Sequence, residues 1–302
     1  MLASLSGTDP VIHNTFDEAS AVLGYDLWHL VQEGPQERLN STEYTQPAML
    51  ASGFATARLW ATRGGKDPAV VAGHSLGEFT ALVAAGVLEF PVAIALVRFR
   101  GKAMEEAVPA GTGAMAAVLG LDDADVVAAC NEAAQGGVVE PVNFNSPGQV
   151  VIAGETAAVN RAIALARTRG AKRAVILPVS VPSHSSLMRK AAERFGQQLE
   201  KVELRPPRIR YISAVDAAVH SDPTDIRALL ARQLASPVRW VDTVRAIAAT
   251  GVTQLIECGP GKVLTGLNKR IDGVTGVSFA ALEEPSSLDA ALIAMKGSAN
   301  AR

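Results

Sequence analysis

Short strand-like apolar runs alternate with segments of helical periodicity along almost all of this 302-residue chain. A continuous apolar run of a few residues is consistent with a buried strand, whereas apolar residues spaced three and four apart indicate a helix packed on one face. Their alternation is typical of a parallel sheet covered by helices, so the sequence predicts an α/β fold. The expected helices span residues 11–23, 48–62, 76–87 and 91–108, and the expected strands outside the middle of the chain span 69–72 and 253–256.

The middle of the chain follows a different order of elements. Strand, helix, strand, strand, helix and strand are expected at 114–119, 122–134, 138–143, 149–153, 156–169 and 173–179. This is the ferredoxin-like order. The sequence therefore predicts a ferredoxin-like subdomain inserted at 109–180, with 1–108 and 181–302 closing into one larger, α/β-hydrolase-like catalytic subdomain.

Composition excludes several classes of partner. Charged residues make up 19% of the chain and the formal net charge is −2, which gives no electrostatic reason to expect nucleic acid or a membrane surface. The apolar stretches are shorter than the roughly 20 residues of a membrane span, and no signal-type segment opens the chain. Cys130 and Cys258 form no metal-type spacing, and so few thiols fit a reducing compartment. We expect a cytoplasmic protein without a metal.

One motif carries candidate chemistry. Gly73-His74-Ser75-Leu76-Gly77 fits G-x-S-x-G, the nucleophile elbow in which a serine lies on a sharp turn between a strand and a helix. The N–H groups at the start of that helix, with Leu76 nearest, would stabilise an oxyanion formed at an attacked carbonyl. The alternative is that Ser75 only caps the helix after a buried strand.

A nucleophilic serine needs a base, and the candidates are the histidines. The chain has five: His13, His29, His74, His184 and His220. Three of them lie in helical patterns or in a polar stretch, where we expect solvated surface. His74 adjoins Ser75, but neighbouring strand residues point to opposite faces. His184 remains as the candidate base, because it follows the last strand of the predicted subdomain in a loop that returns to the larger body.

Several stretches together resemble one family, the malonyl-CoA:acyl carrier protein transacylases of bacterial fatty acid synthesis. They occur in the family's order: Thr45-Gln46-Pro47-Ala48, Ala72-Gly73-His74-Ser75-Leu76-Gly77-Glu78, Arg100-Gly101-Lys102, Gly111-Thr112-Gly113-Ala114-Met115, Asn143-Phe144-Asn145-Ser146-Pro147-Gly148-Gln149, Val181-Pro182-Ser183-His184 and Glu257-Cys258-Gly259-Pro260-Gly261-Lys262. Each motif is modest alone, whereas the ordered set is specific. The family's two-part architecture also agrees with the predicted insertion.

The resemblance implies a role for each matching residue of the reacting centre. Ser75 would carry the malonyl group as an ester, and His184 would take the serine proton and later activate the incoming thiol. A backbone carbonyl, here that of Gln233, would orient the histidine in place of the carboxylate of other serine enzymes.

Substrate recognition is implied in the same way. Arg100 would bind the free carboxylate that distinguishes malonyl-CoA from acetyl-CoA, since a planar guanidinium can hold a carboxylate with two hydrogen bonds. Arg98, two residues earlier on the same expected helix, should point elsewhere. Gln46 and His74 match positions near the family's site and are candidate substrate contacts.

The resemblance also implies the partners. The acceptor would be acyl carrier protein, a small acidic protein with a phosphopantetheine thiol, and no separate cofactor is expected because CoA and phosphopantetheine enter as substrates. The basic pairs Lys172-Arg173 and Lys269-Arg270 are candidates for its docking surface, although basic pairs are often only solvated charges.

Members of the family normally begin with an apolar strand followed by Gly-Gln-Gly-Ser-Gln, which would supply an interior strand and a second oxyanion donor. The present sequence begins at Met1-Leu2-Ala3-Ser4, where that motif should have ended. A misassigned start is the expected reason, ahead of a trimmed chain or a decayed copy. The alternatives for function are an α/β-hydrolase-type carboxylesterase, a stand-alone acyltransferase for polyketide synthesis, and an inactive truncated relative.

Overall fold

A computed structural model describes residues 1–109, 111–179 and 181–299. Helices make up most of it, as expected from the alanine-rich periodic segments. They are α1 (Ala3–Ser6), α2 (Val11–Leu23), α3 (Leu27–Glu33), α4 (Gln36–Asn40), α5 (Thr42–Thr62), α6 (Gly77–Ala84), α7 (Phe90–Glu105), α8 (Asp123–Ala134), α9 (Thr156–Thr168), the short 3₁₀ helix η1 (Ser186–Met188), α10 (Arg189–Leu199), α11 (Pro223–Gln233), α12 (Trp240–Ala249), α13 (Val263–Asn268) and α14 (Pro285–Ala299).

The strands form three separate sheets in the described part of the chain. They are β1 (Val70–Val71), β2 (Gly113–Leu119), β3 (Val139–Ser146), β4 (Gln149–Glu155), β5 (Arg173–Ile176), β6 (Arg210–Ile212), β7 (Val219–His220), β8 (Gln254–Glu257) and β9 (Ser278–Ala281). Two pairs, β1 with β6 and β8 with β9, are parallel. The chain is therefore an α/β protein, but the parallel strands are short and lie in two sheets rather than in the one continuous sheet predicted.

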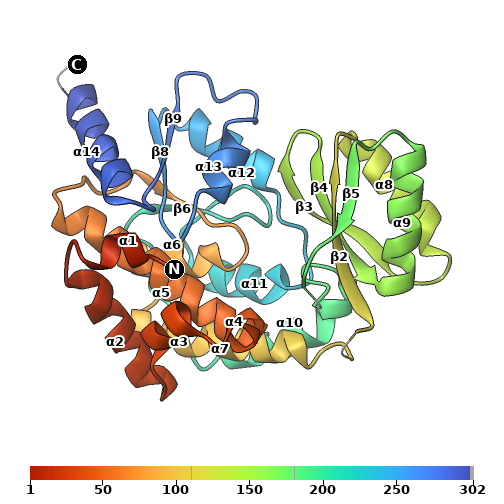
Figure 1. The fold of residues 1–302 in the computed structure, drawn as a ribbon, viewed down its shortest axis with the longest axis horizontal. Helices are drawn as coiled ribbons and strands as arrows, with labels where there is room; N and C mark the ends of the chain where they lie inside the picture. Colours follow the sequence, from red (N-terminus) through yellow and green to blue (C-terminus); the bar gives the residue numbers. More distant parts are fainter. Residues whose placement is uncertain (110, 180, 300–302) are drawn as a thin grey trace.

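The third sheet comes from the middle of the chain and is antiparallel throughout, in the order β3-β4-β2-β5. The observed elements follow the predicted succession of strand, helix, strand, strand, helix and strand. Helices α8 and α9 pack on this sheet, and Figure 1 shows the whole unit standing beside the larger helical body. Its buried side chains, Val118, Cys130, Ile152 and Ile163 among them, form a core of their own. A few residues of the predicted subdomains lie outside the described residues. They are Ala110 and Ser180, near the two ends of the predicted ferredoxin-like subdomain, and residues 300–302 of the predicted catalytic subdomain.

The larger body is built around the crossing of α5 and α7. Gly101 makes this crossing close, because a Cβ atom there would lie 2.4 Å from the backbone oxygen of Thr42. The close approach lets the first turn of α5 pack against α7. Helix α5 begins at Thr42, ahead of the predicted start at residue 48, and it includes Pro47. The crossing brings Arg100 on α7 next to Gln46 on α5.

The two bodies are joined by backbone hydrogen bonds beside β3. The Phe144 N–H donates to the Val238 oxygen over 3.0 Å, and the Val238 N–H donates to the Val142 oxygen over 2.8 Å. A side-chain bond from His74 in the larger body to Asn145 on β3 lies close by. The small sheet thus forms one side of the region that contains Ser75. None of the helices in the described residues is both long enough and apolar enough to cross a membrane.

Candidate active site

Ser75 lies on the sharp turn between β1 and α6, as the G-x-S-x-G motif predicted. Its φ of 51° is in the left-handed region, which is uncommon for a residue with a side chain and recurs at functional turns. Gly73 is required by this turn, because a Cβ there would lie 1.9 Å from the Gly77 carbonyl carbon. Leu76 is the N-cap residue of α6, so its backbone N–H lies at the helix end beside the serine.

His184 is brought to Ser75 from the loop between β5 and η1. Its Nε2 lies 2.7 Å from the Ser75 Oγ, and its Nδ1 lies 2.9 Å from the backbone oxygen of Gln233. A carbonyl oxygen can only accept, so Nδ1 carries the hydrogen and Nε2 is left to accept from the serine hydroxyl. The His184 N–H also donates to the Leu234 oxygen, which fixes the loop at the C-terminal end of α11.

Burial determines the protonation of His184. The side chain is 3% exposed, and burial together with the nearby Arg100 charge lowers its pKa from 6.5 to about 3. The imidazole is therefore uncharged at neutral pH, the form that a general base requires. The orienting group is a neutral carbonyl rather than a carboxylate, so it fixes the tautomer without adding a negative charge.

This protonation predicts the pH dependence of Ser75 acylation. Because the folded pKa lies below the ordinary value of 6.5, the neutral base is fully present above that pH and is lost only as the pH falls toward about 3. We expect the acylation rate constant to stay nearly constant between about pH 6 and pH 8. Single-turnover acylation across this range is the measurement, and a protonation midpoint near 6.5 would contradict the buried, neutral base.

Arg100 is the largest fully buried side chain of the described residues, with an exposure of 1%. Its Nη1 donates to Gln46 Oε1 over 2.9 Å, and its Nη2 lies 2.8 Å from Gln233 Oε1 and 3.3 Å from Ser75 Oγ. Its Nε has no hydrogen-bond partner among the described residues. Burial lowers the pKa of Arg100 to about 10, so the guanidinium stays charged at neutral pH. A fixed cation with a buried, unpartnered Nε thus lies beside the nucleophile.

Arg98 points away from this centre, as expected from its position two residues earlier. Its Nε donates to Glu43 Oε1 over 2.9 Å, and its Nη1 donates to the Leu23 oxygen over 3.2 Å.

Gln233 contributes more than the backbone carbonyl that the family resemblance implied. Its side-chain Oε1 accepts from Arg100, while its Nε2 donates to the backbone oxygen of Ser75 over 3.1 Å and to the carboxylate of Glu78. Glu78 was missed as a site residue by sequence reasoning. The available signal was a lone acidic side chain in an otherwise apolar helix, three residues after the serine.

His74 lies beside the nucleophile but bonds elsewhere. Its Nε2 is 2.8 Å from Asn145 Oδ1, and its ring lies 5.6 Å from that of Trp240. Burial lowers the pKa of His74. The residue therefore connects the larger body to β3 across the site.

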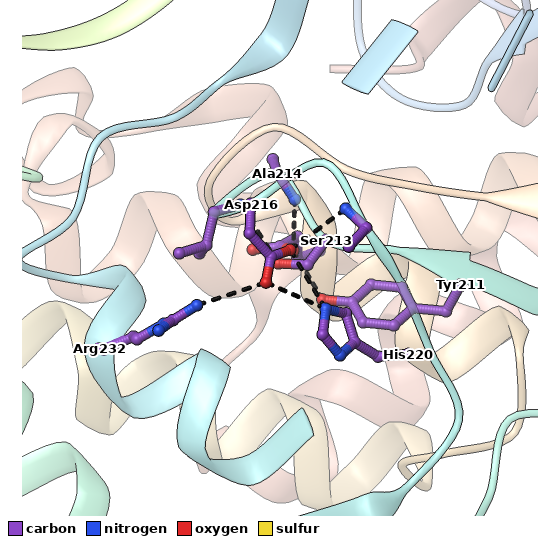
Figure 2. A network of polar contacts seen from close by, with 9 residues as sticks. Tyr211, Ser213, Ala214, Asp216, His220 and Arg232 are labelled. Atoms are coloured by element: carbon purple, nitrogen blue, oxygen red, sulfur yellow. Dashed lines mark hydrogen bonds and ion pairs between the residues drawn. The ribbon is translucent and has the colours of Figure 1, made fainter. Parts of the chain in front are cut away.

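The remaining histidines lie outside this cluster. His13 and His29 are exposed, as expected, whereas His220 is partly buried and its Nε2 lies 3.1 Å from Asp216 (Figure 2).

The four basic residues named as docking candidates are exposed, and Lys172 and Arg173 lie at one end of the small sheet, where β5 begins. Leu119 at that end pairs with Gln149 on one side and with Arg173 on the other. The Arg270 Nη2 donates to Gln149 Oε1 over 2.8 Å, so the segment that follows α13 contacts the same end of the small sheet. The two basic pairs are therefore brought together, although they are far apart in the sequence.

The arrangement is suited to acyl transfer. A serine on a strained turn, a neutral histidine within hydrogen-bond distance and N–H groups at a helix end can form and break an ester without a metal. In the described part of the chain, no group of three or more His, Cys, Asp or Glu side chains could hold one. The fold and the site define the class: a serine-dependent acyl-transfer enzyme.

Comparison with known proteins narrows this class. The family model described as an acyl transferase domain matches residues 1–281. The malonyl CoA-acyl carrier protein transacylase of Escherichia coli strain K12 is 55% identical over 292 residues, 97% of this chain and 94% of its own. That of Bacillus subtilis strain 168 is 41% identical over 288 residues, 95% of this chain and 90% of its own.

Solved structures agree. An acyl carrier protein S-malonyltransferase from Vibrio cholerae has a TM-score of 0.92 and 55% identity, covering 96% of this chain and 94% of its own. A malonyl-transacylase in complex with a type II polyketide synthase acyl-carrier protein has a TM-score of 0.95 and 54% identity, covering 97% of this chain and 94% of its own. The chain belongs to the acyl transferase family and, within it, to the malonyl-CoA:acyl carrier protein transacylases.

Proposed function

We propose that this enzyme transfers a malonyl group from malonyl-CoA to the phosphopantetheine thiol of acyl carrier protein, through an ester on Ser75, for fatty acid synthesis. The observation that carries the proposal is the buried Arg100 guanidinium 3.3 Å from the Ser75 Oγ, with its Nε unpartnered. A donor edge of Nε and Nη2 can hold the free carboxylate of a malonyl group beside the nucleophile. The names of the relatives agree with this substrate and this acceptor.

Acylation of Ser75 is the first half-reaction. The Ser75 Oγ attacks the thioester carbonyl while His184 Nε2 takes the hydroxyl proton. The resulting oxyanion is stabilised by N–H groups at the start of α6, with Leu76 the nearest. When the tetrahedral intermediate collapses, the carbon–sulfur bond breaks and the CoA thiolate takes the proton from His184. The CoA thiol and the His184 imidazole are then both neutral, and the malonyl group remains on the Ser75 Oγ.

The second half-reaction reverses these roles. The carrier thiol gives its proton to His184 Nε2, and the thiolate attacks the ester carbonyl on Ser75. Collapse breaks the carbon–oxygen bond, and the Ser75 alkoxide takes the proton back. The Gln233 backbone carbonyl holds the same imidazole tautomer in both halves. A neutral orienter suits this reversible exchange, since it does not strongly favour the imidazolium form.

Two further residues position the substrate in this proposal. Gln46 accepts from Arg100 Nη1 and so keeps the guanidinium turned toward Ser75. His74, fixed by Asn145, forms part of the wall between the two bodies against which the acyl chain would lie.

Carrier-protein docking follows from the surface at the end of the small sheet. Lys172, Arg173, Lys269 and Arg270 form one basic docking surface, because the row of Leu119 and Gln149 brings the two pairs together. Complementary charge toward an acidic partner mainly increases the association rate and fixes the docked orientation.

Charge reversal on the docking surface should affect only the second half-reaction, the transfer to carrier protein. We expect Lys269→Glu/Arg270→Glu to lower kcat/KM for carrier protein by about tenfold or more at low salt, because attraction becomes repulsion. Acylation of Ser75 by malonyl-CoA should be unchanged. The matched control is Arg63→Glu/Lys66→Glu, two exposed basic residues after α5, near α14. Equal losses in both half-reactions, or in the control, would contradict docking at this surface.

A polyketide carrier protein is a second candidate acceptor, because a relative of 54% identity has been solved with such a protein. A carboxylesterase is less well supported, since the His184 Nδ1 bonds a backbone carbonyl rather than a carboxylate.

The division of the chain and its compartment are also proposals. We assign 109–180 to a ferredoxin-like subdomain and 1–108 with 181–302 to an α/β-hydrolase-like catalytic subdomain. The strand order β3-β4-β2-β5 and the separate core support this division. A cytoplasmic location is supported by the two free cysteines.

The test of the function is a transfer assay with malonyl-CoA and holo carrier protein. Formation of malonyl carrier protein in proportion to released CoA would support the proposal. CoA release with free malonate would indicate an esterase instead. No release of CoA would indicate an inactive relative.

A further inference from the structure

Glu78 is a buried carboxylate in the first turn of the helix that follows the nucleophile. Glu78 lies on α6, three residues after Ser75, and the residue is only 1% exposed. Its Oε1 accepts from the Tyr211 hydroxyl over 2.6 Å and from the Ala214 N–H over 3.0 Å, and its Oε2 accepts from Gln233 Nε2. Figure 2 shows Tyr211 on β6 and Ser213 and Ala214 on the segment that follows this strand. A buried charge held by several donors needs a reason in the reaction or in the fold.

The donors around Glu78 favour its ionised form, whereas burial opposes that form. The Ala214 N–H and the Gln233 amide nitrogen can only donate, and each occupies a different carboxylate oxygen. A proton on Glu78 would compete with one of them. Burial raises the pKa of Glu78, and the hydrogen bonds from Tyr211, Gln233 and Ala214 act in the opposite direction. The compensating positive charge is Arg100, whose pKa is in turn raised by Glu78.

Gln233 connects these two charges. Its Nε2 donates to Glu78 and its Oε1 accepts from the Arg100 Nη2 over 2.8 Å. The carboxylate on one side and the guanidinium on the other allow only one orientation of the amide. The chain Glu78–Gln233–Arg100 therefore holds the Nη2 end of the guanidinium, and the Nε beside it has no partner among the described residues.

We propose that Glu78 is a positioning residue for acyl-group specificity: through the Gln233 amide it holds Arg100 in the orientation that receives the carboxylate of the acyl group. The inference rests on the proposed function, in which that acyl group is malonyl. Glu78 does not touch the substrate. Its effect on His184 is small by comparison, because His184 bonds the backbone oxygen of Gln233 and not its side chain.

Glu78→Gln separates this role from a structural one. The new amide can still accept from Tyr211 and Ala214, but its nitrogen then meets the Gln233 nitrogen, donor against donor. The Gln233 amide must rotate, which turns its nitrogen toward Arg100 and displaces the guanidinium. The rate constant of acylation by malonyl-CoA, which needs the Arg100 guanidinium to hold its carboxylate, should fall. Acylation by acetyl-CoA, which has no carboxylate to bind, should change little.

The experiment measures single-turnover acylation of Ser75 by each thioester. We expect Glu78→Gln to lower the ratio of malonyl to acetyl rate constants by about 10–100-fold, as for loss of a charge-assisted hydrogen bond. The matched control is Glu257→Gln, a carboxylate that accepts from the Leu264 and Thr265 N–H groups away from the site, and its ratio should stay unchanged.

Other results would overturn the inference. An unchanged ratio, with both rate constants reduced together, would make Glu78 a structural residue. A raised ratio would mean that Glu78 acts only as an opposing charge. If Glu78→Gln does not fold, the same ratio is measured in Glu78→Asp, which keeps the charge but withdraws it from Gln233: a lowered ratio supports the inference and an unchanged one overturns it. Failure of the unaltered enzyme to accept malonyl-CoA would instead overturn the proposed function.

Discussion

Replacing His184 with alanine is expected to slow acylation of Ser75 by malonyl-CoA about 10³–10⁴-fold, because the serine hydroxyl loses the base that takes its proton. The 2.7 Å contact between His184 Nε2 and Ser75 Oγ is the basis of this expectation. Binding of malonyl-CoA should persist, since Arg100 retains its contacts with Gln46 and Gln233. Single-turnover acylation at saturating malonyl-CoA is the measurement.

The control for this variant is His29→Ala. His29 is exposed on α3, so its removal should leave the rate constant unchanged. An acylation rate within tenfold of the unaltered enzyme in His184→Ala would contradict the assignment of His184 as base.

Replacing Arg100 with alanine should remove the preference for malonyl-CoA. Losing a buried, hydrogen-bonded partner of a charge typically costs 2–5 kcal/mol, so kcat/KM for malonyl-CoA should fall by about 30-fold to several thousand-fold. Acetyl-CoA has no carboxylate for this guanidinium, so its kcat/KM should fall far less. The variant should also unfold more easily than the unaltered protein, because Glu78 would lose its compensating charge.

Arg98→Ala is the matched control, since it removes an arginine from the same helix that pairs with Glu43 instead. Its discrimination between the two thioesters should be unchanged. If Arg100→Ala still preferred malonyl-CoA by the original factor, carboxylate recognition would have to lie elsewhere. Competition kinetics with both thioesters in one reaction measures this preference.

The fold was predictable where a single segment carries its own signal. Helix α2 coincides with the predicted range of 11–23, because its apolar periodicity and the terminal Gly24 both mark it. Helix α5 begins earlier than predicted, at Thr42, although Pro47 disfavours helical geometry in the residue before it. Tertiary packing prevailed there, since Gly101 lets the first turn of α5 lie against α7. The pairing of the parallel strands was not visible, because strands of two to four residues carry no information about their neighbours.

The same limit applied to the site. The nucleophile elbow and the loop with His184 were identified from short motifs, since their glycines and flanking elements are local. The side-chain contacts of Gln233 and the burial of Glu78 depend on α6, α11 and β6 meeting in space. A glutamate in the first turn of a helix is usually a solvated partner of the helix dipole, so the sequence alone gives no reason to expect this one to be buried.

The central claim is that Ser75 carries the malonyl group and passes it to a thiol. The most direct measurement is the intact mass of the protein after brief exposure to malonyl-CoA, and again after addition of holo carrier protein, with Ser75→Ala as control. We expect one malonyl adduct on the unaltered protein, none on the control, and transfer of the adduct to the carrier protein. An adduct that persists in Ser75→Ala, or no adduct on the unaltered protein, would contradict the claim.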